Sequence, residues 1–121
     1  MKYLLLLNNE VADWESWRDL SPEEARKLRE AEMPRWTELF AWIGDRGLDV
    51  DGLELDDPTK ARVVRVRDGE TMVTDGPYAE TKEVLGGYFV VDCDDLDQAI
   101  ELAQRVPVAA KGSVEIRPFA Q

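Results

Sequence analysis

The alternation of apolar and polar positions predicts a mixed chain of strands and helices, which begins with a strand. Tyr3 to Leu7 is continuously apolar, as is typical of a strand that is buried on both faces. Residues 10–20 are predicted as a loop. A helix should then begin, because Ser21 can cap it, Pro22 suits its first position and Glu24 completes a capping box.

This first predicted helix has one apolar face and one helix breaker. The apolar face follows the i, i+3, i+4, i+7 spacing and consists of Trp36, Leu39, Phe40 and Ile43. Pro34 lacks an N–H and its ring collides with the preceding turn, so we expect a kink or a break near Met33. Gly44 and Gly47 should end the helix. Trp42 falls outside the apolar face and is a candidate for a subunit interface.

The middle of the chain predicts an edge strand followed by a hairpin. Residues 48–55 alternate weakly and indicate the edge strand, whereas residues 61–67 indicate a stronger one. Asp68-Gly69 is a strong signal for a two-residue hairpin turn. Such a turn would create two favourable cross-strand pairs, Arg67 with Glu70 and Val64 with Val73.

The last part of the chain repeats the order of loop, strand, helix and strand. Residues 74–85 are predicted as a loop that contains one helical turn, and residues 86–92 as a strand. Asp94 is expected to cap the second helix, and Pro107 to end it. The apolar stripe of this helix is predicted to be Leu96, Ala99, Ile100 and Ala103. Residues 113–117 form the last predicted strand.

This order of elements predicts a single α+β domain over residues 1–121. It corresponds to a ferredoxin-like βαββαβ arrangement with an extra hairpin strand, in which two helices cover one face of a mainly antiparallel sheet. The first strand and the strand at 86–92 offer apolar residues to both faces of that sheet. No third helix is predicted for the other face, so we expect a second copy of the chain to cover it.

Charge and the shortness of the apolar runs exclude several classes of protein. The formal net charge is −11, and the basic residues are scattered among acidic ones. Binding to nucleic acid or to an anionic membrane is therefore not expected. The run from Tyr3 to Leu7 is too short for a signal peptide or a membrane span, so we expect a cytoplasmic protein.

The chain also lacks the residues that most metal and cofactor sites require. It contains no histidine and a single cysteine, Cys93, which excludes an internal disulfide and the usual zinc, copper and haem sites. We therefore predict neither a metal nor a cofactor. A group of four aspartates could bind a hard cation, but helix capping accounts for it without one: Asp92, Asp94, Asp95 and Asp97. Their negative charge disfavours a reactive thiolate at Cys93.

One stretch of sequence is specific enough to indicate a family. The segment from Asp75 to Glu83, followed by Gly86-Gly87-Tyr88, resembles the signature of the YCII-related family, and more narrowly of its DGPF-domain branch. Tyr78 stands where that branch has phenylalanine. Further similar segments cover most of the chain in the same order: the opening Met1 to Tyr3 with its leucine run, Asp92 to Leu96, and Glu115 to Pro118.

The resemblance implies a dimeric α+β barrel but little about activity. The wider family is suspected of enzymatic function because a histidine and an aspartate recur together. Asp75 matches the aspartate, whereas this chain has no counterpart of the histidine, so a His–Asp pair cannot operate here. Members of the branch are often encoded beside extracytoplasmic-function sigma factors. This context implies an accessory role in regulation and a regulatory protein partner.

The candidate site residues each have a functional and a structural interpretation. Asp75 could act as a general acid or base if burial raised its pKa, or it could simply form the turn of an Asp-Gly-Pro sequence. Arg65 and Lys82 could hold an anionic ligand, or they could belong to a solvated face. Trp36, Trp42 and Tyr78 could line an aromatic pocket for a planar metabolite, although Trp36 also fits the core face of its helix.

Three functions therefore remain open. The first is a homodimeric accessory protein that binds a small-molecule ligand at Asp75, Tyr78, Lys82, Arg65 and Trp36. The second is a cofactor-free acid–base enzyme in which Asp75 is catalytic. The third is a dimer that serves only to bind another protein. The absence of histidine favours the first over the second, and the signature segment argues against the third.

Overall fold

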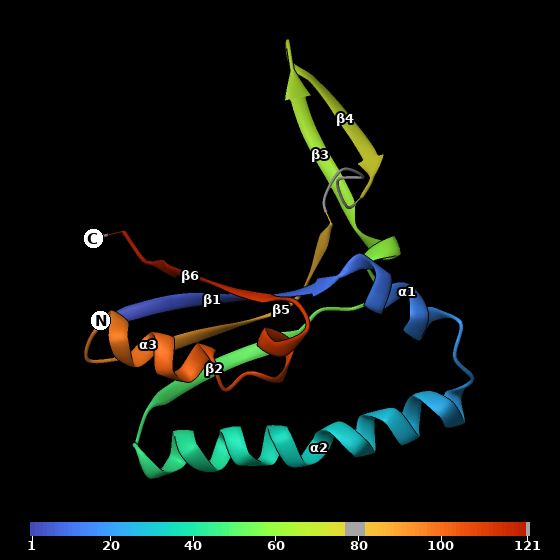
Figure 1. The fold of residues 1–121 in the computed structure, drawn as a ribbon. Helices are drawn as coiled ribbons and strands as arrows, with labels where there is room; N and C mark the ends of the chain where they lie inside the picture. Colours follow the sequence, from blue (N-terminus) through green and yellow to red (C-terminus); the bar gives the residue numbers. More distant parts are fainter. Residues whose placement is uncertain (77–81, 121) are drawn as a thin grey trace.

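Four strands form an antiparallel sheet in the order β2-β5-β1-β6. The structure is a computed structural model that describes residues 1–76 and 82–120 (Figure 1). The strands of this sheet are β1 (Lys2–Glu10), β2 (Asp49–Glu54), β5 (Glu83–Asp92) and β6 (Ser113–Pro118). The remaining elements are α1 (Val11–Arg18), α2 (Pro22–Asp45), α3 (Leu96–Ala103), the 3₁₀ turns η1 (Pro58–Lys60) and η2 (Pro107–Ala110), and the hairpin strands β3 (Arg62–Arg67) and β4 (Glu70–Asp75).

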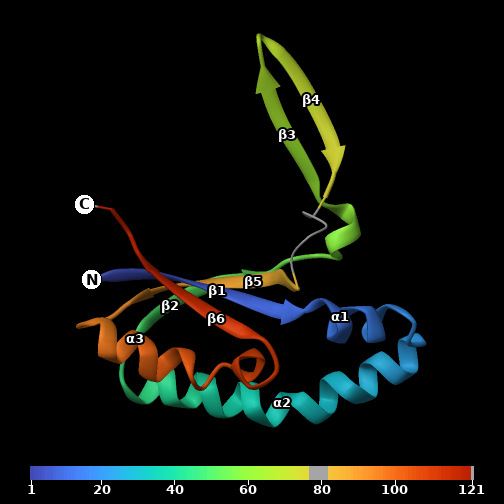
Figure 2. The same ribbon diagram turned by 45° about the horizontal axis from the view of Figure 1, so that its top comes forward.

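Helices α2 and α3 lie on the same face of the sheet, as Figures 1 and 2 both show. Alternate residues of the strands point toward these helices and are buried, among them Leu5 of β1 and Val91 of β5. They pack against Leu39 of α2 and Leu102 of α3, which are also fully buried. The predicted α+β class, with two helices on one face of an antiparallel sheet, is confirmed.

The first helical region differs from its prediction in two ways. The segment predicted as a loop contains α1, in which Arg18 lies over the ring of Trp14 at 5.3 Å. Of the kink or break predicted near Met33, the break is wrong, because α2 runs uninterrupted from Pro22 to Asp45. Pro34 lies on an exposed part of α2, so the carbonyl that loses its partner can bond to water.

The hairpin turn and its register are as predicted, but the hairpin does not join the main sheet. Arg67 pairs with Glu70 and Val64 with Val73, and both turn residues have positive φ angles, 53° at Asp68 and 78° at Gly69. The expectation of an extra strand in the sheet is wrong, because β3 and β4 form a separate two-stranded sheet. We call residues 62–75 the arm. It rises from the body on the side opposite the helices (Figures 1 and 2).

The ends and the buried face of α3 also differ in detail from the sequence expectation. Asp95, not Asp94, is the N-cap, and its side chain accepts a hydrogen bond from the backbone N–H of Gln98. The buried residues of the helix are Ala99, Leu102 and Ala103, whereas Leu96 and Ile100 are 49% and 45% exposed. The predicted apolar stripe is wrong at Leu96 and Ile100, because the sheet lies against a neighbouring face of this short helix.

The face of the sheet opposite the helices is not covered by any described element. The strand pairing places two neighbouring rows of apolar side chains on this face, which we call the open face: Leu4 and Val90 in one row, and Leu6, Tyr88 and Leu53 in the other. Leu53 is 69% exposed, and the others are partly exposed. Asp51 of β2 and Arg117 of β6 lie at the two edges of the open face, in the same row as Leu4 and Val90.

Within residues 1–76 and 82–120, no helix is both long enough and apolar enough to span a membrane.

Candidate functional site

Asp75 lies at the base of the arm, where β4 ends. The next residue, Gly76, donates its backbone N–H to the carbonyl of Ala61 at 3.0 Å, which closes the open end of the hairpin. The side chain of Asp75 is 89% exposed and lies 3.5 Å from Nε of Arg62. An acid–base role would require the side chain of Asp75 to be buried, and the described part of a single chain does not bury it.

The two predicted anion-binding residues do not converge on Asp75 within the described structure. In the hairpin register Asp75 is opposite Arg62, whereas Arg65 is opposite Met72. Because neighbouring positions along a strand alternate between faces, Arg65 and Asp75 point to opposite faces of the arm. Lys82 lies just before β5, and its carbonyl accepts a hydrogen bond from the backbone N–H of Val11 at 2.9 Å. Its side chain is exposed.

The aromatic candidates are also separated. Trp36 lies on the helix-covered side of the sheet and meets the ring of Phe89 edge-on, with 6.5 Å between ring centroids. It therefore packs with the core, on the side of the sheet away from the arm. Tyr78 lies outside the described residues. Trp42, which was expected at a subunit interface, instead packs against the core, because α2 turns this side of its surface toward α3.

The glycine pair of the signature segment has a packing role in β5. A Cβ atom at Gly86 would collide with the side-chain amide of Asn9, and one at Gly87 would come within 3.1 Å of the Leu53 carbonyl. The register of β1 and β5 also shifts between Leu7 and Asn8, opposite these glycines. The pair therefore allows β5 to pass closely between its neighbours β1 and β2.

Near the base of the arm, the open face becomes polar. Ser113 Oγ donates a hydrogen bond to Glu83 Oε2 at this end of the sheet, and Asn8 pairs with Ser113 across β1 and β6. A set of hydroxyl, amide and carboxylate groups can bind a polar ligand by hydrogen bonds.

The acidic segment around Cys93 shows structural roles. Cys93 is 3% exposed, and burial raises the pKa of its thiol, which opposes reactivity as a nucleophile. Asp95 caps α3. In the part of the chain that the structure describes, no three acidic or cysteine groups are arranged to hold a metal ion.

A cavity on the helix side was missed by sequence reasoning. It measures about 430 Å³ and lies between α2 and the segment from the end of α3 to η2. Its charged lining residues are Arg35, Glu38 and Arg105. Two distant segments build it, so no local motif signals it. The only local hint is that Arg35 and Glu38, three positions apart, share one side of a predicted helix.

Comparison with known proteins agrees with the family that the signature segment indicates. A curated relative, an uncharacterised protein of Rhizobium meliloti (strain 1021), is 47% identical over 64 residues, which are 51% of this chain and 52% of the relative. The match thus spans about half the length of that relative. The model of the YCII-related domain matches residues 1–121. The chain belongs to the YCII-related family.

Proposed function

We propose that the protein is a homodimeric accessory protein of the DGPF type that binds a small molecule, and that the open faces of two copies pack together to close an α+β barrel. The observation that carries this proposal is the uncovered open face itself. Its five apolar side chains form two neighbouring rows across β2, β5 and β1. An antiparallel sheet with apolar residues on both faces requires a cover on each.

A second copy fits the open face because the charges at its edges are self-complementary. Asp51 and Arg117 lie in one row, at opposite edges of the sheet. A two-fold axis parallel to the strands would place Asp51 of one copy over Arg117 of the other, and the reverse pair would form by symmetry. An interface of ordinary size needs about 800 Å² from each partner, so we expect the open face and the arm both to contribute to it.

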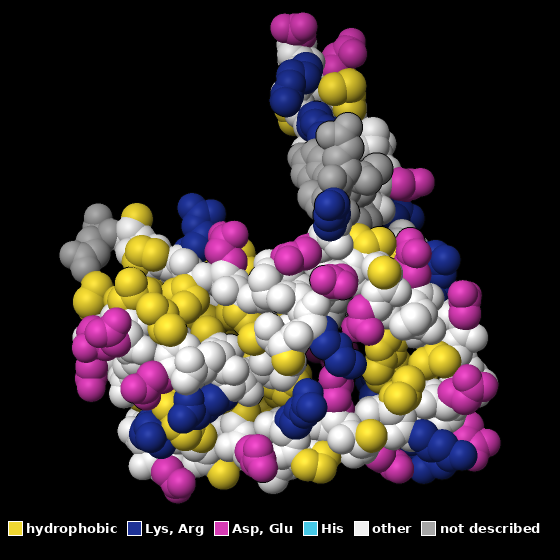
Figure 3. Space-filling model, viewed as in Figure 1, with side chains coloured by type: hydrophobic (Ala, Val, Ile, Leu, Met, Phe, Trp, Pro, Cys, Tyr) yellow, Lys and Arg dark blue, Asp and Glu magenta, His cyan; other side chains and the backbone are white. Residues whose placement is uncertain are grey.

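The arm supports the same arrangement. It rises on the side of the open face (Figure 2) and exposes Val64, Val66 and Val73, each about three-fifths exposed. A two-stranded hairpin alone is only marginally stable in water. Figure 3 shows how far the arm stands away from the body, so a second copy would give these valines a surface to pack against.

In such a dimer, the space for a ligand would lie at the polar end of the open face and the base of the arm. Asp75 and Lys82, which lie near the two ends of the segment from Asp75 to Glu83, are exposed there. A partner that covers the open face would enclose this space and reduce the exposure of Asp75. Tyr78 is a further candidate for it, whereas Arg65 points to the other face of the arm from Asp75. Binding is favoured over acid–base catalysis because the chain has no histidine that could act with Asp75 as an acid–base pair.

The dimer is tested by measuring molecular mass in solution with analytical ultracentrifugation. We expect the wild type to be a dimer and Leu53→Asp to be a folded monomer, since the substitution places a charge on the most exposed apolar side chain of the open face. Leu28→Asp is the matched control, because Leu28 is also exposed but lies on α2. A monomeric wild type, or a dimeric Leu53→Asp variant, would overturn the proposal.

A charge swap tests the orientation of the two copies. Asp51→Arg and Arg117→Asp should each weaken the dimer, and the double variant should restore it.

Ligand binding is tested separately by native mass spectrometry of the dimer after exposure to a metabolite library. Asp75→Asn or Lys82→Ala should reduce the bound species, whereas Glu70→Gln at the tip of the arm should not. The regulatory protein partner remains a prediction from the resemblance.

A further inference from the structure

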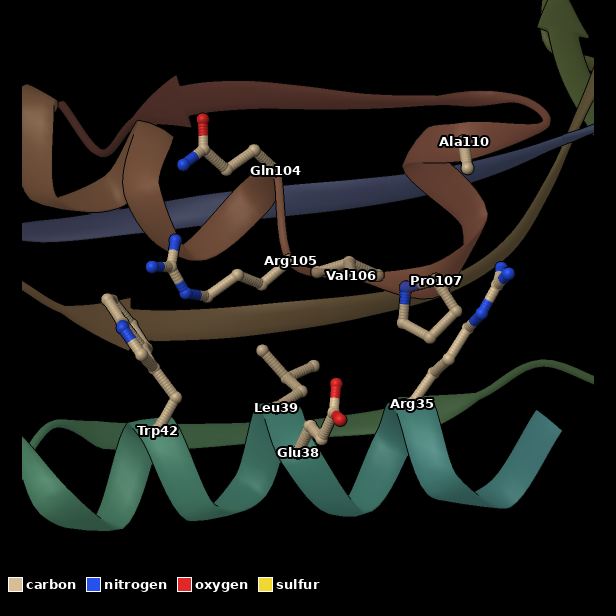
Figure 4. A pocket seen from close by; sticks show the side chains of 9 residues that line it. All are labelled: Arg35, Glu38, Leu39, Trp42, Gln104, Arg105, Val106, Pro107 and Ala110. Carbon is tan, nitrogen blue, oxygen red and sulfur yellow. The ribbon is translucent and has the colours of Figure 1, made fainter.

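The cavity between α2 and the segment after α3 has the features of a second binding site, on the opposite side of the sheet from the arm. Its volume of about 430 Å³ is within the range of pockets for small molecules. Leu39 and Val106, both 1% exposed, form its apolar floor together with the buried Pro107. Figure 4 shows charged side chains standing around this floor.

One wall of the cavity holds a guanidinium in a fixed position. Arg105 lies over the ring of Trp42 at 4.5 Å, and Arg46 lies over the same ring at 4.2 Å. Stacking of this kind orients a guanidinium plane. Nη1 of Arg105 donates a hydrogen bond to the carbonyl of Glu101 at 3.0 Å, which leaves other N–H groups of this side chain for a ligand.

The indole of Trp42 adds an unusual feature to this wall. Its Nε1–H is buried and has no hydrogen-bond partner among the described residues. Such a group normally finds a partner in a protein interior. An oxygen atom of a ligand would reach this N–H if the indole turned toward the cavity, because Nε1 is closed to solvent in the structure.

The charges along the cavity alternate in sign. In Figure 4, Arg105 lies with Trp42 at one end, Glu38 in the middle, and Arg35 beside Pro107 at the other end. Among the described residues, Glu38 forms no ion pair with Arg35 or with Arg105. The three side chains sum to a charge of +1 in a protein whose net charge is −11, so this lining would attract an anion locally.

From this order of charges we propose that the cavity binds an amino dicarboxylic acid with a short carbon chain. One carboxylate would bind Arg105 beside the Trp42 indole, and the ammonium group would bind Glu38. The second carboxylate would bind Arg35, and the carbon chain would lie on Leu39, Val106 and Pro107. Guanidinium–carboxylate pairs are the strong contacts in this arrangement. The site is separate from the open face and does not depend on the dimer.

The test uses the indole as its reporter and L-glutamate as the probe. In ¹H–¹⁵N spectra the four tryptophans give separate indole signals, and Trp42→Phe identifies the signal of Trp42. Titration with L-glutamate should shift this signal to saturation. Glutarate lacks the ammonium group and L-glutamine lacks the second carboxylate, so each should bind about tenfold more weakly.

Variants of the lining residues complete the design. Arg35→Gln, Glu38→Gln and Arg105→Gln should each weaken binding of L-glutamate about tenfold, and the first two change exposed side chains that the fold does not need. Lys111→Gln, which changes a basic residue outside the cavity, should leave binding unchanged, and so should the interface variant Leu53→Asp. The proposal fails if L-glutamate does not shift the Trp42 signal. It also fails if Arg35→Gln and Lys111→Gln bind alike, or if glutarate binds as tightly as L-glutamate.

Discussion

Individual residues of the same chemical type in this protein play different roles, depending on their surroundings. Asp75 faces water at the base of the arm, Asp95 caps a helix, and Asp56 forms an ion pair with Lys60 at 2.8 Å that lowers the pKa of its carboxyl group. The thiol of Cys93 is buried in the core. The raised pKa of this thiol has a consequence for stability at alkaline pH.

We predict that the wild type loses stability relative to Cys93→Ala as the pH rises above about 9. The ordinary value for a thiol is 9.0, and burial raises the pKa of Cys93 in the folded protein. Below pH 9 the thiol is protonated in both states and contributes no pH dependence. Above it, the unfolded thiol ionises while the folded one resists, so unfolding becomes easier by at most about 1.4 kcal/mol per pH unit. Urea unfolding of both proteins from pH 7 to 10 measures this, and a constant difference between them would contradict it.

From the sequence, the candidate site could be predicted only as a list of residues with suitable chemistry, without the direction in which each side chain points. Asp75, Arg65 and Lys82 were chosen for chemistry that their side chains can perform, and nothing local shows which face of a strand each will occupy. The hairpin register decides that Arg65 and Asp75 point apart. Trp36 was assigned both to a pocket and to the core, and its contact with Phe89 supports the core assignment.

At the scale of elements, short sequence motifs predicted correctly those features that depend only on neighbouring residues. The Asp68-Gly69 turn fixed the hairpin register, because its positive φ angles need only these two residues. The detachment of the hairpin from the sheet could not be predicted, since no residue in β3 specifies its neighbour. Helix α1 was missed for a related reason: it buries no residue completely, so it lacks the apolar stripe by which helices are recognised.

The cap of α3 gives a test at this scale. Asp95→Ala should lower the free energy of unfolding by about 1 kcal/mol, because it removes the 2.9 Å hydrogen bond between the Asp95 carboxylate and the backbone N–H of Gln98. Asp94→Ala is the matched control. The bond of Asp94 to Gln98 uses its backbone N–H, which the substitution keeps. Thermal or urea unfolding measures both variants, and equal losses would show that Asp95 is not the cap.

The molecule as a whole combines one covered and one uncovered face of a sheet with a strongly acidic surface. The covered face and the two helices follow from amphipathic patterns that the sequence displays. The need for a cover on the open face follows from apolar residues on both sides of β1 and β5. The cavity does not follow from any pattern, because α2 and the segment after α3 meet only in the folded chain.

Salt dependence tests the proposed dimer at this scale. Two copies that each carry a net charge of −11 repel one another, and salt screens this repulsion, since the Debye length falls from about 10 Å at 0.1 M to about 3 Å at 1 M. We therefore expect the dimer to dissociate less readily in 0.5 M than in 0.05 M sodium chloride. Sedimentation equilibrium at both concentrations measures it. Weaker association in high salt would mean that edge pairs such as Asp51 with Arg117 dominate the interface.

The arm also bears on how the chain avoids aggregation. In the described structure β3 and β4 pair only with each other, so each has an outer edge of unpaired backbone groups onto which another chain could add a strand. The sequence of β3, Arg-Val-Val-Arg-Val-Arg, alternates β-forming valines with arginines. Like charges on an identical incoming strand repel, so these arginines act as gatekeepers. If a second copy covers the arm as proposed, these arginines would protect a newly made chain from fibrous self-association until the valines are covered.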